Sequence, residues 1–172
     1  MENGKERLGR LGEEVFLRYL KVKKKEQDFE ILKPDYVLKK KGYKPIFIEI
    51  KTQERFYPPP FEGHGLPIHQ VEKYMLVYKE DKIKCFLFII EPDTGIIWGR
   101  SLHKLEEGEK IVTRKKKRVL YPLKNFKRFF EIEELSKKYN FSAELKKEYI
   151  RSEIIKRLED EDFIRKILGD LK

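Results

Sequence analysis

A glutamate and a lysine two positions apart in an apolar run are the residues of this chain best placed to do chemistry. Glu49 and Lys51 lie in the run 45–52 (PIFIEIKT). Side chains alternate across a β-strand, so both would project from one face, with Ile48 and Ile50 on the other. A carboxylate and an ammonium on a half-buried strand cost free energy unless they are paired or used. This face is therefore the first candidate for a functional site.

A second carboxylate belongs to the segment before this run. Asp35 opens the short apolar segment 35–38, and a turn at Gly42 separates that segment from 45–52. Two such runs around a glycine-containing turn predict a β-hairpin. Pairing within this hairpin can bring Asp35 beside Glu49.

Neighbouring carboxylates need a compensating charge, and this need suggests the chemistry. Two of them repel, and one takes up a proton unless a cation compensates. Mg²⁺ and Mn²⁺ suit hard oxygen ligands. Such an ion can activate a water molecule and stabilise the charge that develops on a phosphodiester as it breaks. Lys51 would orient or deprotonate that water, or offset the phosphate charge.

The segment 5–21 has the period of an amphipathic helix and carries a third carboxylate. Glu13 falls on its apolar side beside Leu20, where a carboxylate needs a partner such as a metal site. Glu14 falls on the polar side and is typical of a solvated ion-pair former. Its neighbours on that side are Arg7, Arg10 and Arg18.

These residues, in this order, resemble the PD-(D/E)xK motif of the restriction-endonuclease-like superfamily. The dipeptide 34–35 (PD) is followed, after thirteen residues, by 49–51 (EIK). The segment 9–15 (GRLGEEV) resembles the helix before the motif in nucleases similar to Holliday-junction resolvases. Residues 70–74 (QVEKY) match the QxxxY pattern of RecB-like members. The first helix lacks the histidine that RecB-like proteins often place there.

The resemblance implies an α/β (α+β) fold with a restriction-endonuclease-like core, in which helices flank a central four-stranded mixed β-sheet. It also implies a metal-dependent DNA endonuclease that hydrolyses phosphodiester bonds with Mg²⁺ or Mn²⁺. The metal ligands would be Glu13, Asp35, Glu49 and the backbone carbonyl of Ile50. The catalytic set would be Glu13, Asp35, Glu49, Lys51, Gln70 and Tyr74.

Further elements follow from local patterns. The segment 57–67 is rich in proline and glycine and predicts a loop, and Pro67 can begin a helix that runs to about Lys79. Residues 85–91 and 96–99 predict a second hairpin around the turn 92–95 (PDTG).

Three side chains of metal-binding type lie in these regions. His64 and His69 are expected to be exposed, with metal or phosphate binding as the alternative, and Cys85 is expected to be a buried strand residue.

The length of 172 residues indicates a single domain. We expect residues 1–135 to form the nuclease core and 136–172 a C-terminal helical extension, helical from about residue 142. That extension either belongs to the same domain or contacts a second subunit or DNA.

The charge favours a polyanionic partner. The formal net charge is +10, and the segment 114–128 carries eight Lys or Arg residues and no acid, interleaved with aromatic residues. Such a block suits a nucleic-acid backbone better than it suits a merely solvated turn. We therefore expect DNA, double-stranded or branched, to be contacted by Lys115, Lys116, Lys117 and Arg118. A homodimer would allow both strands to be cut.

The composition also bears on habitat and compartment. Charged residues make up 41% of the chain, while Gln, Asn and Thr are scarce, a bias that resembles proteins from hot environments. The N-terminus lacks the shape of a signal peptide, and we expect a cytoplasmic protein.

Two alternatives stay open at this point. Glu49 and Lys51 could form an ordinary exposed strand face, with Asp35 a turn residue and Gln70 and Tyr74 structural. The whole chain could also be a non-catalytic DNA-binding or scaffold module that retains the nuclease fold. The sequence does not distinguish DNA from RNA as substrate, or endonuclease from exonuclease activity.

Overall fold

The computed structural model describes residues 34–132 and 152–172. The helix expected over residues 5–21, with Glu13, lies outside these ranges, as does the boundary expected at residue 135.

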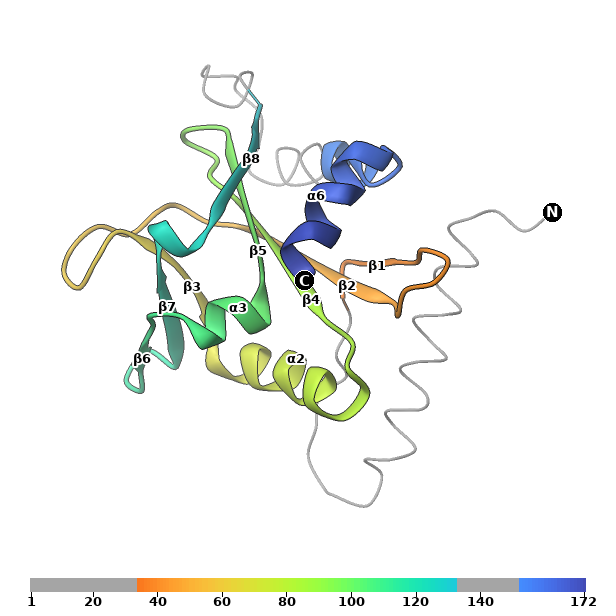
Figure 1. Ribbon diagram of the computed structural model, residues 1–172. Coiled ribbons are helices and arrows are strands. Elements are labelled where there is room, and N and C mark those ends of the chain that lie inside the picture. Colours follow the sequence, from red (N-terminus) through yellow and green to blue (C-terminus); the bar gives the residue numbers. More distant parts are fainter. Residues whose placement is uncertain (1–33, 133–151) are drawn as a thin grey trace.

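A mixed five-stranded β-sheet forms the centre of the structure (Figure 1). Its order is β1-β2-β4-β5-β8, and only β2 and β4 run parallel to each other. The expected mixed sheet flanked by helices is confirmed, with five strands where four were expected. The additional edge strand, β8, begins in the last two residues of the basic segment 114–128, and no strand is predicted there from the sequence. The strands are β1 Tyr36–Leu38, β2 Ile46–Thr52, β4 Cys85–Ile90, β5 Ile96–Ser101 and β8 Lys127–Glu131.

Both predicted hairpins are confirmed. β1 pairs with β2 in an antiparallel register that sets Tyr36 opposite Ile48. β4 pairs with β5 in the same sense, with Ile90 opposite Ile97. In the first turn Gly42 has φ of 85°, a backbone conformation that favours glycine.

The central strand β4 is buried on both faces, as expected for its uninterrupted apolar run. Cys85 is buried there, which confirms its predicted place. Phe86, Phe88 and Ile90 belong to one core layer, and Cys85, Leu87 and Ile89 to the other. The sheet therefore separates two apolar layers, and Glu49 shares its face with the second of them, because it alternates with Ile48 and Ile50 of the first.

The second layer is covered by two helices and a small second sheet (Figure 1). Helix α2 (Ile68–Asp81) extends slightly beyond the predicted end and contributes Val71, Tyr74 and Val77 to this layer. The second sheet has the order β3-β7-β6. The remaining elements are β3 Gly63–Pro67, α3 Leu102–Glu107, β6 Ile111–Thr113, β7 Arg118–Pro122 and the 3₁₀ helix η1 Leu123–Asn125.

The prediction of a loop over residues 57–67 is wrong for its last five residues, which form β3. The two glycines that suggested a loop allow close pairing with β7 instead. A Cβ at Gly63 would lie 2.0 Å from the backbone oxygen of Tyr121, and one at Gly65 would lie 2.9 Å from that of Val119. Glycine here permits a close backbone approach and does not end the strand.

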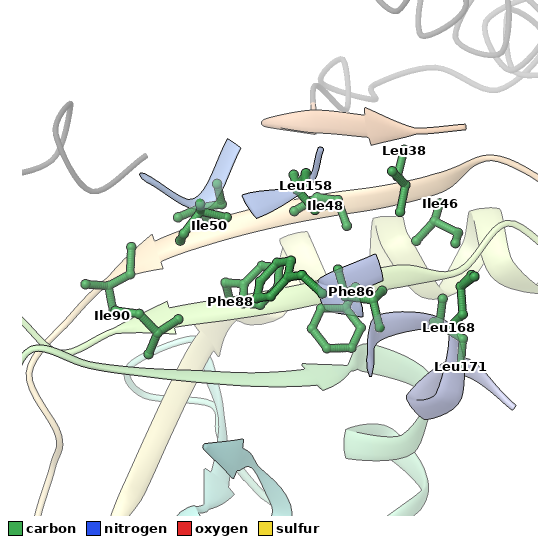
Figure 2. Packing of buried hydrophobic residues seen from close by; sticks show 14 of the residues in the cluster. Leu38, Ile46, Ile48, Ile50, Phe86, Phe88, Ile90, Leu158, Leu168 and Leu171 are labelled. Carbon is green, nitrogen blue, oxygen red and sulfur yellow. The ribbon is translucent and has the colours of Figure 1, made fainter. Parts of the chain in front are cut away.

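The C-terminal segment packs on the opposite face of the sheet. The extension is expected to be helical from about residue 142, and residues 142–151 lie outside the described ranges. Residues 152–157 are helical, and α6 (Glu161–Leu171) begins after Asp160, whose carboxylate accepts from two N–H groups of the first turn. Leu158, Leu168 and Leu171 lie in one layer with apolar residues of β2 and β4 (Figure 2). No helix in the two described ranges is long and apolar enough to cross a membrane.

Candidate active site

The carboxylate of Glu49 is held by three side chains. Lys51 Nζ lies 2.8 Å from Oε1, and Gln70 Nε2 donates to the same oxygen at 2.7 Å. The hydroxyl of Tyr74 donates to Oε2 at 2.5 Å. Only 5% of the Glu49 surface is exposed. A buried carboxylate with this many donors is a fixed group whose direction is set by its neighbours.

These contacts leave the carboxylate able to accept more. An ionised carboxylate has about four lone-pair positions. Within the described residues, the contacts of Glu49 take two positions at Oε1 and one at Oε2. A position on Oε2 is thus available to a further ligand.

Helix α2 supplies two of the three donors because of its spacing. Gln70 and Tyr74 are four residues apart and lie on one side of the helix. Tyr74 is buried and packs edge-on against Phe47 of β2. Burial, together with the charge of Glu49 and its hydrogen bond with the hydroxyl, raises the pKa of Tyr74. Its hydroxyl therefore keeps its proton and donates to Glu49.

Asp35 directly precedes β1, the strand that pairs with β2. Its Oδ2 accepts a hydrogen bond from the backbone N–H of Ile50 at 2.8 Å. The β1–β2 register, continued by one residue beyond Tyr36, places Asp35 across from Glu49. Residues directly opposite each other in an antiparallel pair have Cβ atoms about 5 Å apart.

Most of the expected site residues thus come together. Six of them form one cluster, and Glu13 lies outside the described residues. The cluster consists of Asp35, Glu49, Ile50, Lys51, Gln70 and Tyr74.

The expected nucleic-acid-binding residues lie in and beside the turn between β6 and β7. Lys115, Lys116 and Lys117 are exposed. Arg118 is half-buried, and its guanidinium donates to the backbone oxygen of Gly65 at 2.8 Å. The backbone N–H of Ile68 donates to the carbonyl of Lys117 at 2.9 Å. The cationic turn therefore adjoins the first turn of α2, the same turn that carries Gln70.

The donor set fits a hard divalent cation. Asp35 and Glu49 offer carboxylate oxygens on adjacent strands, and Mg²⁺ and Mn²⁺ prefer such ligands. The described ranges hold no group of three or more His, Cys, Asp or Glu residues arranged for a metal. Two carboxylates and a backbone carbonyl are the ligands that these ranges can supply, and Glu13 would be a third carboxylate.

A second polar cluster beside this site was not foreseen from the sequence. Glu91 is fully buried and accepts from Arg55 through Nε at 2.7 Å and through a terminal nitrogen at 2.9 Å. Thr94 Oγ1 donates to the same carboxylate at 2.7 Å, and His64 Nε2 lies 2.8 Å from it. Glu91 is the last residue of the predicted strand 85–91 and Thr94 falls in the predicted turn 92–95, so neither position indicated a buried polar cluster.

The expectation that His64 is exposed is wrong, because the side chain is fully buried on β3. The loop prediction for residues 57–67 led to that error. Burial lowers the pKa of His64 below its ordinary value, with the Glu91 carboxylate acting in the opposite direction. His69 is exposed, as expected.

Replacing Arg55 by methionine is expected to destabilise the fold. The change leaves a buried carboxylate without its cation, which costs about 3–5 kcal/mol. Urea unfolding at pH 7 should show a lower midpoint with an unchanged slope. The matched control is Arg165→Met on the exposed side of α6, where loss of an ion pair costs at most about 1 kcal/mol.

The same comparison has a defined pH dependence. Although burial opposes ionisation, hydrogen bonds from Arg55, Thr94 and His64 lower the pKa of Glu91 from 4.5 to about 2. A lowered pKa in the folded state stabilises the protein above the unfolded-state pKa, and this contribution is lost as the pH falls toward 2. The difference in free energy of unfolding between wild type and Arg55→Met should therefore become smaller below pH 4.5. If Arg55→Met loses no more unfolding free energy at pH 7 than Arg165→Met does, this role for Arg55 is contradicted.

Comparisons with known proteins show a structural likeness but no match at the level of sequence families. No family model matches the chain, and no curated protein sequence matches it. Among solved structures, it is similar to Hjc, a Holliday junction resolvase from the archaeal hyperthermophile Archaeoglobus fulgidus. The identity is 16%, the match covers 64% of this chain and 88% of that one, and the TM-score is 0.36. With a TM-score this low, the functional proposal rests on the geometry of the site.

Proposed function

We propose that this chain is a metal-dependent DNA endonuclease of the PD-(D/E)xK type, which hydrolyses phosphodiester bonds. The observation that carries the proposal is the arrangement around Glu49. Lys51, Gln70 and Tyr74 fix this carboxylate, with one contact on Oε2 among the residues that the structure describes, and Asp35 lies directly before the adjacent strand β1. An ordinary strand face would not need three buried or half-buried donors on one carboxylate.

Each residue has a proposed role, argued from its contacts where the structure describes them and from the motif for Glu13. Asp35, Glu49 and the carbonyl of Ile50, together with Glu13, would hold Mg²⁺ or Mn²⁺. The bound ion would supply charge stabilisation for the breaking phosphodiester and a more acidic water. Gln70 and Tyr74 keep the Glu49 carboxylate in one orientation. Lys51 is about one-third exposed, so its ammonium can turn from Glu49 toward the attacking water or the phosphate.

A non-catalytic DNA-binding or scaffold module is the competing function, and a cleavage panel separates the two. The substrates are supercoiled plasmid, single-stranded DNA, a four-way junction and RNA, each with Mg²⁺, Mn²⁺ or excess EDTA. The nuclease proposal expects cleavage of at least one DNA with divalent ions and none with EDTA. Binding without cleavage under every condition would favour the scaffold module instead.

The exposed lysines of the β6–β7 turn are proposed to contact phosphates. Changing Lys115, Lys116 and Lys117 to alanine should weaken binding about equally for all sequences. The log–log dependence of affinity on salt should flatten by roughly 0.9 per lost contact on duplex DNA, near three units in total. Turnover at saturating DNA should change little, because these side chains hold no contact with the Glu49 cluster.

The control for this variant is Lys39, Lys41 and Lys44 changed to alanine in the β1–β2 turn. It removes the same charge from another exposed turn, located at the C-terminal end of α2, where Lys44 donates to the backbone of Asp81. An equal flattening in both triple variants would assign the effect to net charge and not to the β6–β7 turn.

A further inference from the structure

Gln53 follows the two charged residues of β2 on the same side of the chain. Residues 49, 51 and 53 alternate with 50 and 52, and the N–H of Gln53 still pairs with the carbonyl of Ile90. Its side-chain amide forms two hydrogen bonds with the backbone of β3, one as donor and one as acceptor. Nε2 donates to the oxygen of Gly65 at 3.0 Å, and the N–H of Gly65 donates to Oε1 at 3.1 Å. One side chain thus replaces a rung of backbone pairing between β2 and β3.

The backbone at Gly65, which Gln53 contacts, is closely packed on its other sides. Gly65 is buried, and a Cβ there would lie 2.7 Å from the side chain of Leu120. Arg118 donates to the same carbonyl that receives Gln53 Nε2. The backbone of β3 at this point is therefore clamped between β7 on one side and the Gln53 amide on the other.

The orientation of the Gln53 amide is fixed as well. Oε1 accepts from Gly65 and faces His64 Nδ1 at 3.3 Å. The other ring nitrogen of His64 contacts the buried carboxylate of Glu91. Because the amide oxygen and nitrogen each have a defined partner, a flipped amide would lose both bonds to Gly65.

The contacts of Gln53 connect indirectly to the Glu49 carboxylate through β3 and α2. β3 ends at Pro67 and continues directly into α2 at Ile68. Two residues later, Gln70 donates to Glu49 Oε1. The path thus leads from Glu49 along β2 to Gln53, across to β3, into α2 and back to Glu49.

We propose that Gln53 is a positioning residue, which sets the orientation of the Glu49 carboxylate through β3 and the first turn of α2. This inference rests on the proposed metal site. Loss of the two hydrogen bonds between Gln53 and Gly65 lets β3 and the start of α2 shift relative to β2. Gln70 then no longer holds Oε1 of Glu49 in place. Partners of metal ligands typically contribute 10- to 100-fold to metal affinity or activity.

The test is Mn²⁺ binding to the full chain without DNA, measured by calorimetry and by the electron paramagnetic resonance signal of free Mn²⁺. Gln53→Met keeps the length of the side chain and removes both bonds to Gly65. Its Kd for Mn²⁺ should rise about 10- to 100-fold. Affinity for DNA in EDTA should stay within about twofold of wild type, because no basic residue is changed. Glu54→Gln, at the exposed residue next to Gln53 and just after the end of β2, should bind Mn²⁺ like wild type.

A second variant keeps the test decisive if Gln53→Met does not fold. Gln53→Asn retains the amide but withdraws it by one methylene, and its Kd for Mn²⁺ should also rise. Wild-type Mn²⁺ affinity in a folded Gln53 variant would overturn the positioning role alone. Failure of wild type to bind Mn²⁺, or unchanged binding in Glu49→Gln, would instead overturn the metal site on which the role rests.

Discussion

Replacing Glu49 by glutamine is expected to lower kcat for DNA cleavage by at least about 10³-fold, because the bound ion supplies several kcal/mol of transition-state stabilisation. Glutamine keeps the shape of the side chain. Its oxygen can still accept from Lys51 and Gln70, and the hydroxyl of Tyr74 can turn to accept from the new amide. The variant should therefore fold, and cleavage and DNA binding can be measured separately.

DNA binding by Glu49→Gln should survive or tighten, since the change removes a negative charge beside a polyanion. Glu72→Gln on the exposed side of α2 is the matched control and should cleave like wild type. If Glu49→Gln is folded but loses DNA affinity in parallel with cleavage, Glu49 supports the structure of the binding surface and not a metal.

Replacing Lys51 by methionine is expected to reduce kcat by about 10²- to 10⁴-fold, the usual contribution of a group that moves or orients a proton. Methionine preserves the aliphatic stem and removes the ammonium that lies 2.8 Å from Glu49 Oε1. Gln70 still donates to that oxygen, so the carboxylate stays in place. Single-turnover cleavage at saturating DNA and Mg²⁺ measures the loss.

The affinity of Lys51→Met for DNA and for Mn²⁺ should change far less than its turnover. Lys41→Met, in the exposed β1–β2 turn, removes the same charge away from the site and should leave turnover unchanged. A loss of Mn²⁺ affinity as large as the loss of turnover would show that Lys51 serves to shape the metal site and not to assist the water.

The parts of the site that could be predicted from sequence depend on local spacing. Glu49 and Lys51 share a face because strands have a period of two, and Gln70 and Tyr74 share a face because helices turn every 3.6 residues. Antiparallel pairing around the turn at Gly42 then sets Asp35 across from Glu49. These relations need only the periods of strand and helix and one turn.

The parts that escaped prediction depend on contacts between distant segments. β3 looked like a loop because its glycines serve a close approach to β7, which lies more than fifty residues away. The burial of His64 follows from that pairing and from Glu91 at the end of β4. Neither Gln53 nor Arg55 belongs to a recognisable motif. The partner of Gln53 lies on β3 and that of Arg55 directly after β4, so both become apparent only when these segments are placed beside the end of β2.

Anomalous diffraction from crystals grown with Mn²⁺ tests whether Asp35 and Glu49 share a divalent cation. We expect an anomalous peak between the two carboxylates, within about 2.0–2.3 Å of an oxygen of each, as is usual for a hard cation of this size. The Oε2 of Glu49 should be its ligand from β2. Mn²⁺ bound only elsewhere on the surface, or a well-ordered site with no peak at either carboxylate, would show that Asp35 and Glu49 do not share a cation.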